Sequence, residues 1–384
     1  MKEKLLHYIK KIDYIILIAM TILIGIGVYC GQQAFMLSEE QHSIFIKQIA
    51  GIIIGYAFII AILLFDYRFI CNLSFVLYLG MISMLAFILV FGENLNNVKR
   101  WIVIFGIQFQ PSELTKIVLV LFLAFLCNYF KNKLNKFYVL IILGVVIAIP
   151  MLLIVLEPHL SSALALLFIF AIMVYASGMS YKVIGAALAI ILPVIAGIVI
   201  GVAVFHIDIP LIKDYHVNRV LSFLSDDESE NLDEDYQQIQ SIEAIGAGGL
   251  HGKMLSTEAD ENRRYSNIYA KESDFVFAIV GEEFGFLGCV FIISLYAIII
   301  IRCVMISAHA TDYMGKQIGI GISAYMIFQI FVNIGVAVNL LPNTGLPLPF
   351  ISYGLTSLVS SMIAVGLILN VGMRQKTKTT KPIM

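Results

Sequence analysis

Long apolar runs separated by short polar stretches make up most of the chain. A helix needs about 20 apolar residues to cross the hydrocarbon core of a bilayer, so the pattern predicts an all-α, polytopic membrane protein with about ten transmembrane helices. The predicted spans are 13–30, 45–65, 73–92, 112–130, 137–156, 159–176, 181–205, 274–302, 314–340 and 350–373. Only Glu157-Pro158 separates the fifth span from the sixth, because proline cannot continue a helix.

Composition agrees with a membrane protein. The 384 residues are 60% hydrophobic and only 13% charged, whereas a soluble domain has about 25% charged residues. The net charge of −1 and the lack of a basic cluster give no reason to expect nucleic-acid binding. The Lys-rich start and the apolar run after it resemble a signal peptide, but no small-residue cleavage site follows. We therefore interpret this segment as an uncleaved first helix.

Positive charges are concentrated in alternate segments, and this bias predicts the topology. The short outer loops carry only Lys47, Lys99 and Arg100. Residues 1–12 and the tail 374–384 are then cytoplasmic, and 206–273 is one long extracytoplasmic loop between the seventh and eighth helices. The whole chain, 1–384, is predicted to be a single transmembrane domain in the cytoplasmic membrane.

An irregular polar segment lies near the C-terminus, between two apolar runs. It reads Asn339-Leu-Leu-Pro-Asn-Thr-Gly-Leu-Pro-Leu-Pro-Phe-Ile-Ser-Tyr-Gly354, and its prolines and glycines cannot continue a helix. Irregular backbone at the depth of a membrane survives only where protein buries it or where it lines a cavity. This segment is therefore expected to shape a site.

A second polar segment, 99–116, leads into the predicted fourth helix. Pro111 suits the first turn of a helix, and the positive end of the helix dipole favours Glu113 there. Lys116 follows inside the predicted span, where an ionisable side chain is a candidate for function by default. The alternative is a Glu113–Lys116 pair that only neutralises itself, with Trp101 as an anchor at the membrane surface.

Two further segments could carry chemistry at the outer surface. In Glu157-Pro-His-Leu-Ser-Ser162, proline leaves backbone carbonyls open beside Glu157 and His159, although a histidine at a membrane edge is more often structural. In Ser273-Asp-Phe-Val-Phe-Ala, Ser or Asp before an apolar run is a typical helix N-cap. The same position also puts the carboxylate of Asp274 at the outer membrane surface, where it could act on a substrate.

Together these segments resemble the SEDS family of membrane proteins, which includes RodA, FtsW and SpoVE. The matching strings are Arg-Trp-Ile … Phe-Gln-Pro-Ser-Glu-x-x-Lys before Lys116, Tyr-Gln-x-x-Gln-Ser from Tyr236, Ser-Asp-Phe-x-Phe-Ala around Asp274, and the string 339–354. Their order and spacing agree with the family. His159 departs from it, since the family usually has Asp there, and so does Leu355-Thr356, where the family often has Gly-Ser.

The resemblance implies a peptidoglycan glycosyltransferase that polymerises lipid II into glycan strands at the outer face of the membrane, for elongation, division or sporulation. It implies that Asp274 is the catalytic residue. Displacing pyrophosphate from an anomeric carbon needs a base and positive charge at the leaving group. We expect Asp274 to be that base, Lys116 and Arg100 to be the cations, and Glu113 to orient Lys116. The other residues expected to bind substrate are Trp101, Ser112, Glu157, Ser352 and Tyr353.

A divalent cation, Mg²⁺ or Mn²⁺, could bridge Asp274 and phosphate oxygens. The partner that the resemblance implies is a class B penicillin-binding protein, a single-span transpeptidase. Two other functions fit the same sequence. One is a flippase for lipid II, which would use the same charged cavity, and the other is a scaffold that only activates a partner enzyme.

Overall fold

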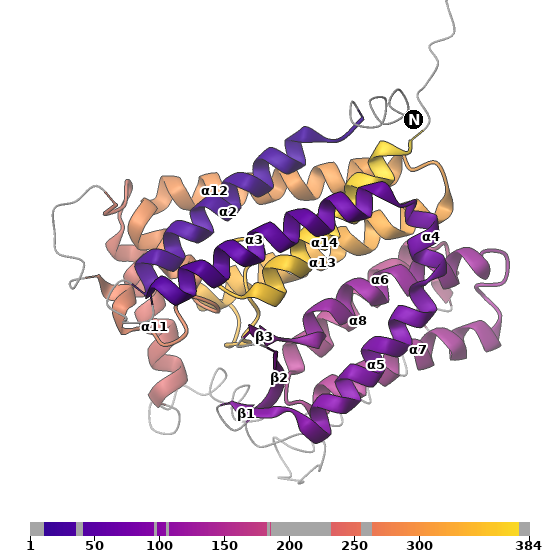
Figure 1. Ribbon diagram of the computed structural model, residues 1–384, viewed down its shortest axis with the longest axis horizontal. Coiled ribbons are helices and arrows are strands. Elements are labelled where there is room, and N and C mark those ends of the chain that lie inside the picture. The colour runs from indigo at the N-terminus through magenta and orange to yellow at the C-terminus, as the bar shows by residue number, and fades with distance from the viewer. Residues whose placement is uncertain are drawn as a thin grey trace, which may run out of the picture.

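The computed structural model describes residues 11–35, 41–95, 98–104, 107–182, 185, 232–254 and 263–375. Long helices lie side by side in this part of the chain and form a bundle (Figure 1). The helices are α2 (Tyr14–Ala34), α3 (Gln41–Leu64), α4 (Tyr67–Asn72), α5 (Ser74–Phe91), α6 (Pro111–Tyr129), α7 (Phe137–Leu156), α8 (Leu160–Ala176), α11 (Leu232–Ala247), α12 (Val276–Ala308), α13 (Tyr313–Ala337) and α14 (Leu355–Met373), with a 3-10 turn, η2, at Arg264–Asn267.

Most of the predicted spans are confirmed as helices. Within the described residues, 8 helices are long and apolar enough to cross a membrane, and α8 is a shorter apolar helix of 17 residues. The predicted span 181–205 and the loop residues 206–231 lie almost entirely outside the described part of the chain. The last predicted span begins too early, because residues 350–354 are irregular and α14 starts only at Leu355, after Gly354.

The helices form layers across the bundle. Helices α2 and α12 lie along one side, α3, α14 and α13 follow, and α6 with α8 and then α5 with α7 complete the other side (Figure 1). Burial separates an inner group of helices from an outer one. Of the apolar window of each helix, 83% of α14 and 72% of α6 and α13 is buried, but only 22% of α3 and 33% of α7.

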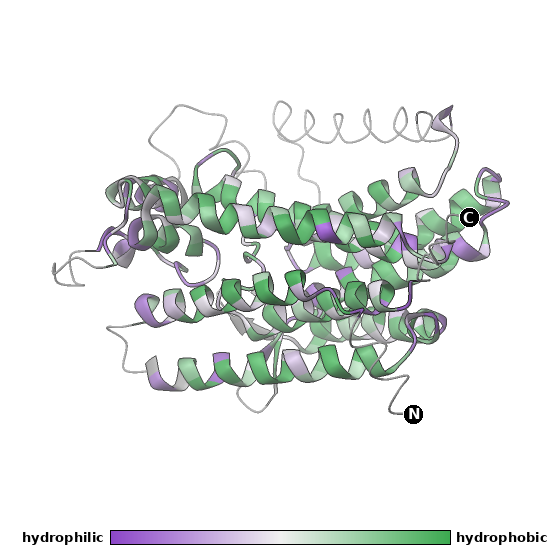
Figure 2. Ribbon diagram, turned by 90° about the horizontal axis from the view of Figure 1, so that it is seen from above, coloured by the Kyte–Doolittle hydropathy of each residue, from purple (hydrophilic) through white to green (hydrophobic). Residues whose placement is uncertain are grey.

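The outer helices expose apolar side chains rather than polar ones. Ile53 on α3 and Val90 on α5 are each about two-thirds exposed, and Ile141 on α7 is half-exposed. Hydrophobic residues cover the flanks of the bundle, while hydrophilic ones gather at its two ends (Figure 2). Apolar surface of this extent belongs in lipid, and the chain is a multi-pass membrane protein.

A small antiparallel sheet precedes α6, in a segment for which the sequence predicted only a loop. Its strands are β1 (Glu93–Leu95), β2 (Val98–Ile104) and β3 (Ile107–Phe109), in the order β1-β2-β3. The pairing of Ile102 with Phe109 fixes the register just before α6 begins. The fold is therefore helical, as expected, with one short β-meander at the end of the bundle that also carries α11 (Figure 1).

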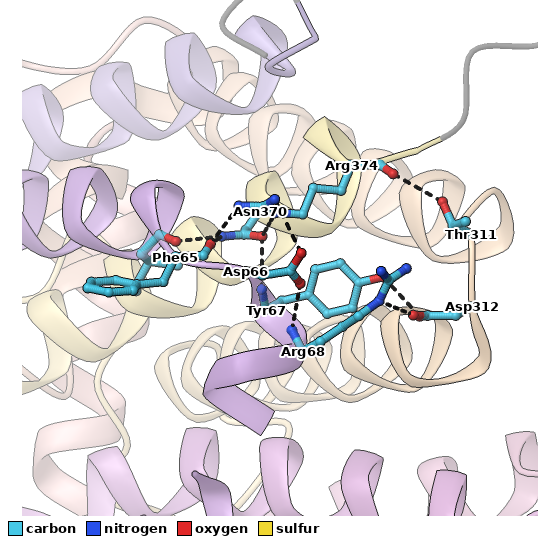
Figure 3. A network of polar contacts seen from close by, with 9 residues as sticks. Phe65, Asp66, Tyr67, Arg68, Thr311, Asp312, Asn370 and Arg374 are labelled. Carbon is cyan, nitrogen blue, oxygen red and sulfur yellow. Dashed lines mark hydrogen bonds and ion pairs between the residues drawn. The ribbon is translucent and has the colours of Figure 1, made fainter. Parts of the chain in front are cut away.

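At the opposite end, α4 joins α3 to α13 and α14 through a polar network (Figure 3). Asn370, which is fully buried on α14, donates to the carbonyls of Ile62 and Phe65 at the end of α3 and accepts from the backbone N–H of Tyr67. The last carbonyls of a helix have no partner within the helix. One side chain thus completes the hydrogen bonding of the α3–α4 corner.

Asp312, the N-cap residue of α13, holds the other side of this corner. It accepts from Tyr67 Oη at 2.9 Å and from Arg68 Nε at 2.6 Å. Burial alone would raise the pKa of Asp312, but hydrogen bonds from Gly315 N, Arg68 and Tyr67 outweigh it and keep this pKa below the usual value. The carboxylate is therefore ionised at neutral pH and stabilises the corner.

We expect Asn370→Leu to lower the stability of the protein by about 2–4 kcal/mol, because it removes the side-chain partner of three backbone groups. The measurement is the melting temperature of the purified protein in detergent. Ser83→Ala is the control, because Ser83 makes only an exposed bond within α5. A wild-type melting temperature for Asn370→Leu would contradict this account of the corner.

Candidate active site

The segments that carry the predicted site residues meet at the end of the bundle that carries α11 and the sheet (Figure 1). Helices α6, α8, α12 and α14 begin there, and α13 ends there. Five segments that are far apart in the sequence therefore converge on one place. The irregular string 339–354 connects α13 to α14 at this end.

Glu113 and Lys116 form an ion pair inside the bundle. Lys116 Nζ lies 2.7 Å from Glu113 Oε1, and both side chains are fully buried. The second carboxylate oxygen of Glu113 accepts from Gln329 Nε2 at 3.2 Å, and Lys116 Nζ lies 5.8 Å from the centroid of the Tyr325 ring. An ammonium group has three N–H donors, so Lys116 can bind Glu113 and still donate to a substrate oxygen.

The elbow between α7 and α8 packs against the start of α6. Arg100, on β2, donates from Nε to the carbonyl of Glu157 at 3.1 Å and from Nη2 to the carbonyl of Pro158. His159 Nδ1 lies 3.4 Å from Ser112 Oγ, and its Nε2 lies 3.3 Å from Ser162 Oγ. The predicted break at Glu157-Pro158 is confirmed, and the carbonyls that it opens bind Arg100.

Glu157 is buried without a hydrogen-bond partner. Its side chain is 1% exposed, and neither carboxyl oxygen has a donor in the structure. Burial raises the pKa of Glu157 to about 8, against the opposing effect of Arg100. This side chain is therefore protonated and neutral over much of the physiological range.

Asp274 precedes α12 and lies against the string 339–354. Asn333, on α13, donates from Nδ2 to the carbonyls of Asp274 at 2.9 Å and Leu346 at 2.7 Å. A methyl group added at Gly345 would lie 3.5 Å from Asp274 Oδ2, and the φ of Gly345, +68°, favours glycine. The N-cap residue of α12 is Phe275, with no side-chain capping bond, so the capping interpretation of Ser273 and Asp274 is wrong.

Ser352 and Tyr353 hold the string against the residues before Asp274. Ser352 Oγ donates to the carbonyl of Ser273 at 2.6 Å and accepts from the backbone N–H of Leu348 at 2.7 Å. The backbone N–H of Tyr353 donates to the carbonyl of Glu272 at 2.8 Å. These contacts fix the chain directly before Asp274. Trp101 lies on β2, where it pairs with Glu93.

Glu282 and Glu283 anchor the segment that leads to Asp274, a role that the sequence did not reveal. Glu282 accepts from Lys253 Nζ and from the backbone N–H groups of Arg264 and Tyr265. Glu283 accepts from Tyr265 Oη and Tyr29 Oη and forms an ion pair with Arg263. Both glutamates are buried, so these bonds are little screened by water.

A break in α12 lies directly after these two glutamates. Gly285 has φ +66°, and the loop after α11 satisfies the backbone groups that the break leaves open. The carbonyls of Glu282 and Glu283 accept from the N–H groups of Lys253 and Met254, and the N–H of Phe286 donates to Gly249. The loop is thus part of the hydrogen bonding of the helix, and it places η2 beside α12.

One face of α13 connects the two halves of the site. Tyr325, Gln329 and Asn333 are spaced four residues apart, so their side chains lie on one face, with about 6 Å between neighbours along the axis. Tyr325 and Gln329 contact the Lys116–Glu113 pair, and Asn333 binds the backbone of Asp274. The signal in the sequence was a row of amides inside an apolar span, where polar side chains bond across helices.

The possible metal ligands among the described residues suit an ion that is shared with a substrate better than an ion held by protein side chains alone. In the part of the chain that the structure describes, no three His, Cys, Asp or Glu side chains come together as a metal site. Mg²⁺ commonly binds one or two carboxylates together with substrate phosphates. Asp274 could therefore hold a divalent ion jointly with phosphate oxygens of a substrate.

The chain is similar to known proteins over almost its whole length. The family model for cell cycle proteins of the FtsW, RodA and SpoVE type matches residues 11–377. The probable peptidoglycan glycosyltransferase FtsW of Geobacter metallireducens is 31% identical over 379 residues, which is 97% of this chain and 97% of that protein. The peptidoglycan glycosyltransferase RodA of Treponema pallidum is 26% identical over 94% of this chain and 98% of its own length.

Two solved structures share the fold. A chain of a peptidoglycan synthase complex, solved to explain how polymerization and crosslinking are coordinated, has a TM-score of 0.77 at 24% identity and covers 94% of this chain and 97% of its own. The rod shape determining protein RodA of Thermus thermophilus has a TM-score of 0.67 at 21% identity and covers 95% of this chain and 98% of its own.

We expect Glu157→Gln to change how stability depends on pH. The pKa of Glu157 in the folded state, about 8, lies above the unfolded value of about 4.3, so the folded state keeps a proton that the unfolded chain has lost. The stability of the wild type therefore falls as pH rises between these two values. The melting temperature of the variant, relative to wild type, should increase between pH 5 and pH 8. The exposed Glu243→Gln is the control, and a constant difference across this range would contradict the prediction.

Proposed function

The chain belongs to the family of the cell cycle proteins FtsW, RodA and SpoVE, and on that basis we propose that it polymerises lipid II into glycan strands as a peptidoglycan glycosyltransferase. Relatives that match nearly the whole chain carry this activity in their names. The observation that carries the proposal for the site is the arrangement around α13. A single helix connects the backbone of Asp274 to the buried Glu113–Lys116 pair.

In the proposed reaction, Asp274 accepts the proton of a sugar hydroxyl. The hydroxyl oxygen forms a bond to the anomeric carbon of the lipid-linked donor, and the bond from that carbon to the pyrophosphate oxygen breaks. The polyprenyl pyrophosphate leaves with the bonding electron pair. A positioned base of this kind accelerates proton transfer by about 10²–10⁴-fold.

Lys116 is the group that we assign to the leaving pyrophosphate. Its ammonium lies in an apolar interior, where a charge–charge interaction is much stronger than in water. Glu113 and Gln329 hold it in place, and Arg100, at the α7–α8 elbow, is the second cation. Because these two cations are already oriented, they need no rearrangement as negative charge develops on the leaving pyrophosphate.

The other expected contacts surround these groups. Trp101 on β2, Ser112 at the start of α6 and Glu157 at the elbow are proposed to contact the substrate near Arg100. Ser352 and Tyr353 are proposed to act mainly through the backbone bonds that keep Asp274 in position. A Mg²⁺ or Mn²⁺ ion, if it takes part, would be held by Asp274 together with phosphate oxygens and would neutralise charge on them.

The location and the partner follow from the same proposal. The site lies at the end of the bundle that the charge bias assigns to the outer face of the cytoplasmic membrane, with both termini on the cytoplasmic side. The structural relative from a complex that combines polymerization with crosslinking supports a transpeptidase partner. We propose a class B penicillin-binding protein, which would crosslink the new strands.

The purified protein, alone or with its transpeptidase, should polymerise lipid II, and Asp274→Asn should lower the rate by about 10²-fold or more because the base is lost. The measurement is the length distribution of glycan products on a gel, with melting temperature as a test of folding. Glu272→Gln is the matched control, since it removes a carboxylate two residues away. The same assay with a chelator tests whether polymerisation needs a divalent cation.

Three outcomes would contradict parts of this proposal. Normal polymerisation by Asp274→Asn would rule out its role as the base. A wild-type protein that moves lipid II across vesicles without polymerising it would be a flippase. A protein that does neither, but activates its partner's polymerisation, would be a scaffold.

A further inference from the structure

Four buried side-chain oxygens, two on α13 and two in the string 339–354, have no hydrogen-bond partner in the structure. They are Gln329 Oε1, Asn333 Oδ1, Asn343 Oδ1 and Thr344 Oγ1. The side chains of Gln329 and Asn333 are 0% and 1% exposed. A buried acceptor without a donor costs about 1–3 kcal/mol, and folded proteins contain few of them. Four of them on two adjoining segments, α13 and the string that Asn333 bonds to, point to a ligand that supplies donors.

The bonds of the two α13 amides fix which way their oxygens point. The nitrogen of Asn333 donates to two backbone carbonyls, and the nitrogen of Gln329 donates to the carboxylate of Glu113. Carbonyls and carboxylates only accept, so exchanging oxygen and nitrogen in either amide would place two acceptors against each other. Both oxygens therefore point away from these protein partners.

Asn343 and Thr344 belong to the same region of the site. Ser161 on α8 donates to the carbonyl of Thr344, and Asn333 donates to the carbonyl of Leu346 two residues later. Gly345, between them, is the residue whose added methyl group would approach Asp274 Oδ2. The segment that carries the unpartnered oxygens is thus held from α8 and α13 and lies beside the proposed base.

These acceptor oxygens and the cations Lys116 and Arg100 prefer different parts of a substrate. Amide oxygens accept hydrogen bonds and repel phosphate, whereas Lys116 and Arg100 attract it. A substrate with an anionic end and a donor-rich end would therefore be oriented along α13. The hydroxyl and amide N–H groups of a saccharide are donors of the required kind.

We propose that Gln329, Asn333, Asn343 and Thr344 form a saccharide subsite that binds the sugar of the lipid-linked substrate through its hydroxyl and amide N–H groups. The pyrophosphate then lies toward Lys116, and the sugar lies between it and Asp274. This assignment rests on the proposed function. It adds to it a set of specificity-determining residues that contact the sugar rather than the reacting pyrophosphate.

The test uses variants that remove an oxygen without removing a bond within the protein. Thr344→Val preserves the shape of the side chain, and Asn343→Leu is a second variant. We measure binding of the purified protein to lipid II, to a peptide-free lipid-linked disaccharide and to polyprenyl pyrophosphate, which has no sugar. Both variants should weaken binding of the first two by about 3- to 10-fold, the effect of one lost hydrogen bond. Binding of polyprenyl pyrophosphate should not change.

Stability provides the second readout. Because Thr344 Oγ1 has no partner to lose, Thr344→Val should melt at or above the wild-type temperature while it binds lipid II more weakly. Gln317→Leu is the matched control, since Gln317 is a fully buried amide near the other end of α13. This control should bind all three lipids as the wild type does.

The proposal is overturned if both variants bind lipid II like the wild type. It is also overturned if their affinity for polyprenyl pyrophosphate falls as much as their affinity for lipid II. Weaker binding of lipid II with unchanged binding of the peptide-free lipid would assign the oxygens to the peptide and also overturn it. Because these are binding measurements, they separate this proposal from the enzyme function. A wild-type protein that binds lipid II but never polymerises it would contradict only the latter.

Discussion

The site depends on hydrogen bonds that α13 makes in apolar surroundings. This helix is 72% buried over its apolar window, so its polar side chains must find partners in the protein or in a ligand. Gln329 and Asn333 use their nitrogens to hold Glu113 and the backbone of Asp274, respectively. If α13 were displaced by one turn, both bonds would be lost together. The spacing between the proposed base and the proposed cation is therefore a property of one rigid element rather than of two loops.

The segment before Asp274 shows how irregular backbone is tolerated beside such a helix. Gly285 interrupts α12, and the loop after α11 bonds to the groups that the break exposes. The buried carboxylates of Glu282 and Glu283 then hold the turn at Arg264–Asn267. A charge buried in this way is stable only when several donors surround it. The network holds the segment that leads to Asp274, the proposed base, and a held position is what catalysis requires of such a group.

Much of this arrangement could be predicted. Apolar length identified the spans, and Pro111 and Pro158 marked helix boundaries that the structure confirms. The strings around Glu113, Asp274 and 339–354 identified the family. The meander at 93–109 and the break at Gly285 were not predicted. Two of the three strands have only three residues, too few for a recognisable alternation. A glycine inside an apolar run has the same pattern whether the helix continues or stops.

By itself, the sequence determined which segments are apolar enough to lie in lipid and which residues are chemically able to act. Those properties depend on local composition and on neighbours within a turn or two. Only the tertiary structure decided that Gln329 binds Glu113, that Asn333 binds the chain at Asp274, and that the segment with the unpartnered oxygens of Asn343 and Thr344 lies against Asp274. These contacts join residues separated by up to 216 positions. They arise from how the helices pack, and no local pattern specifies that packing.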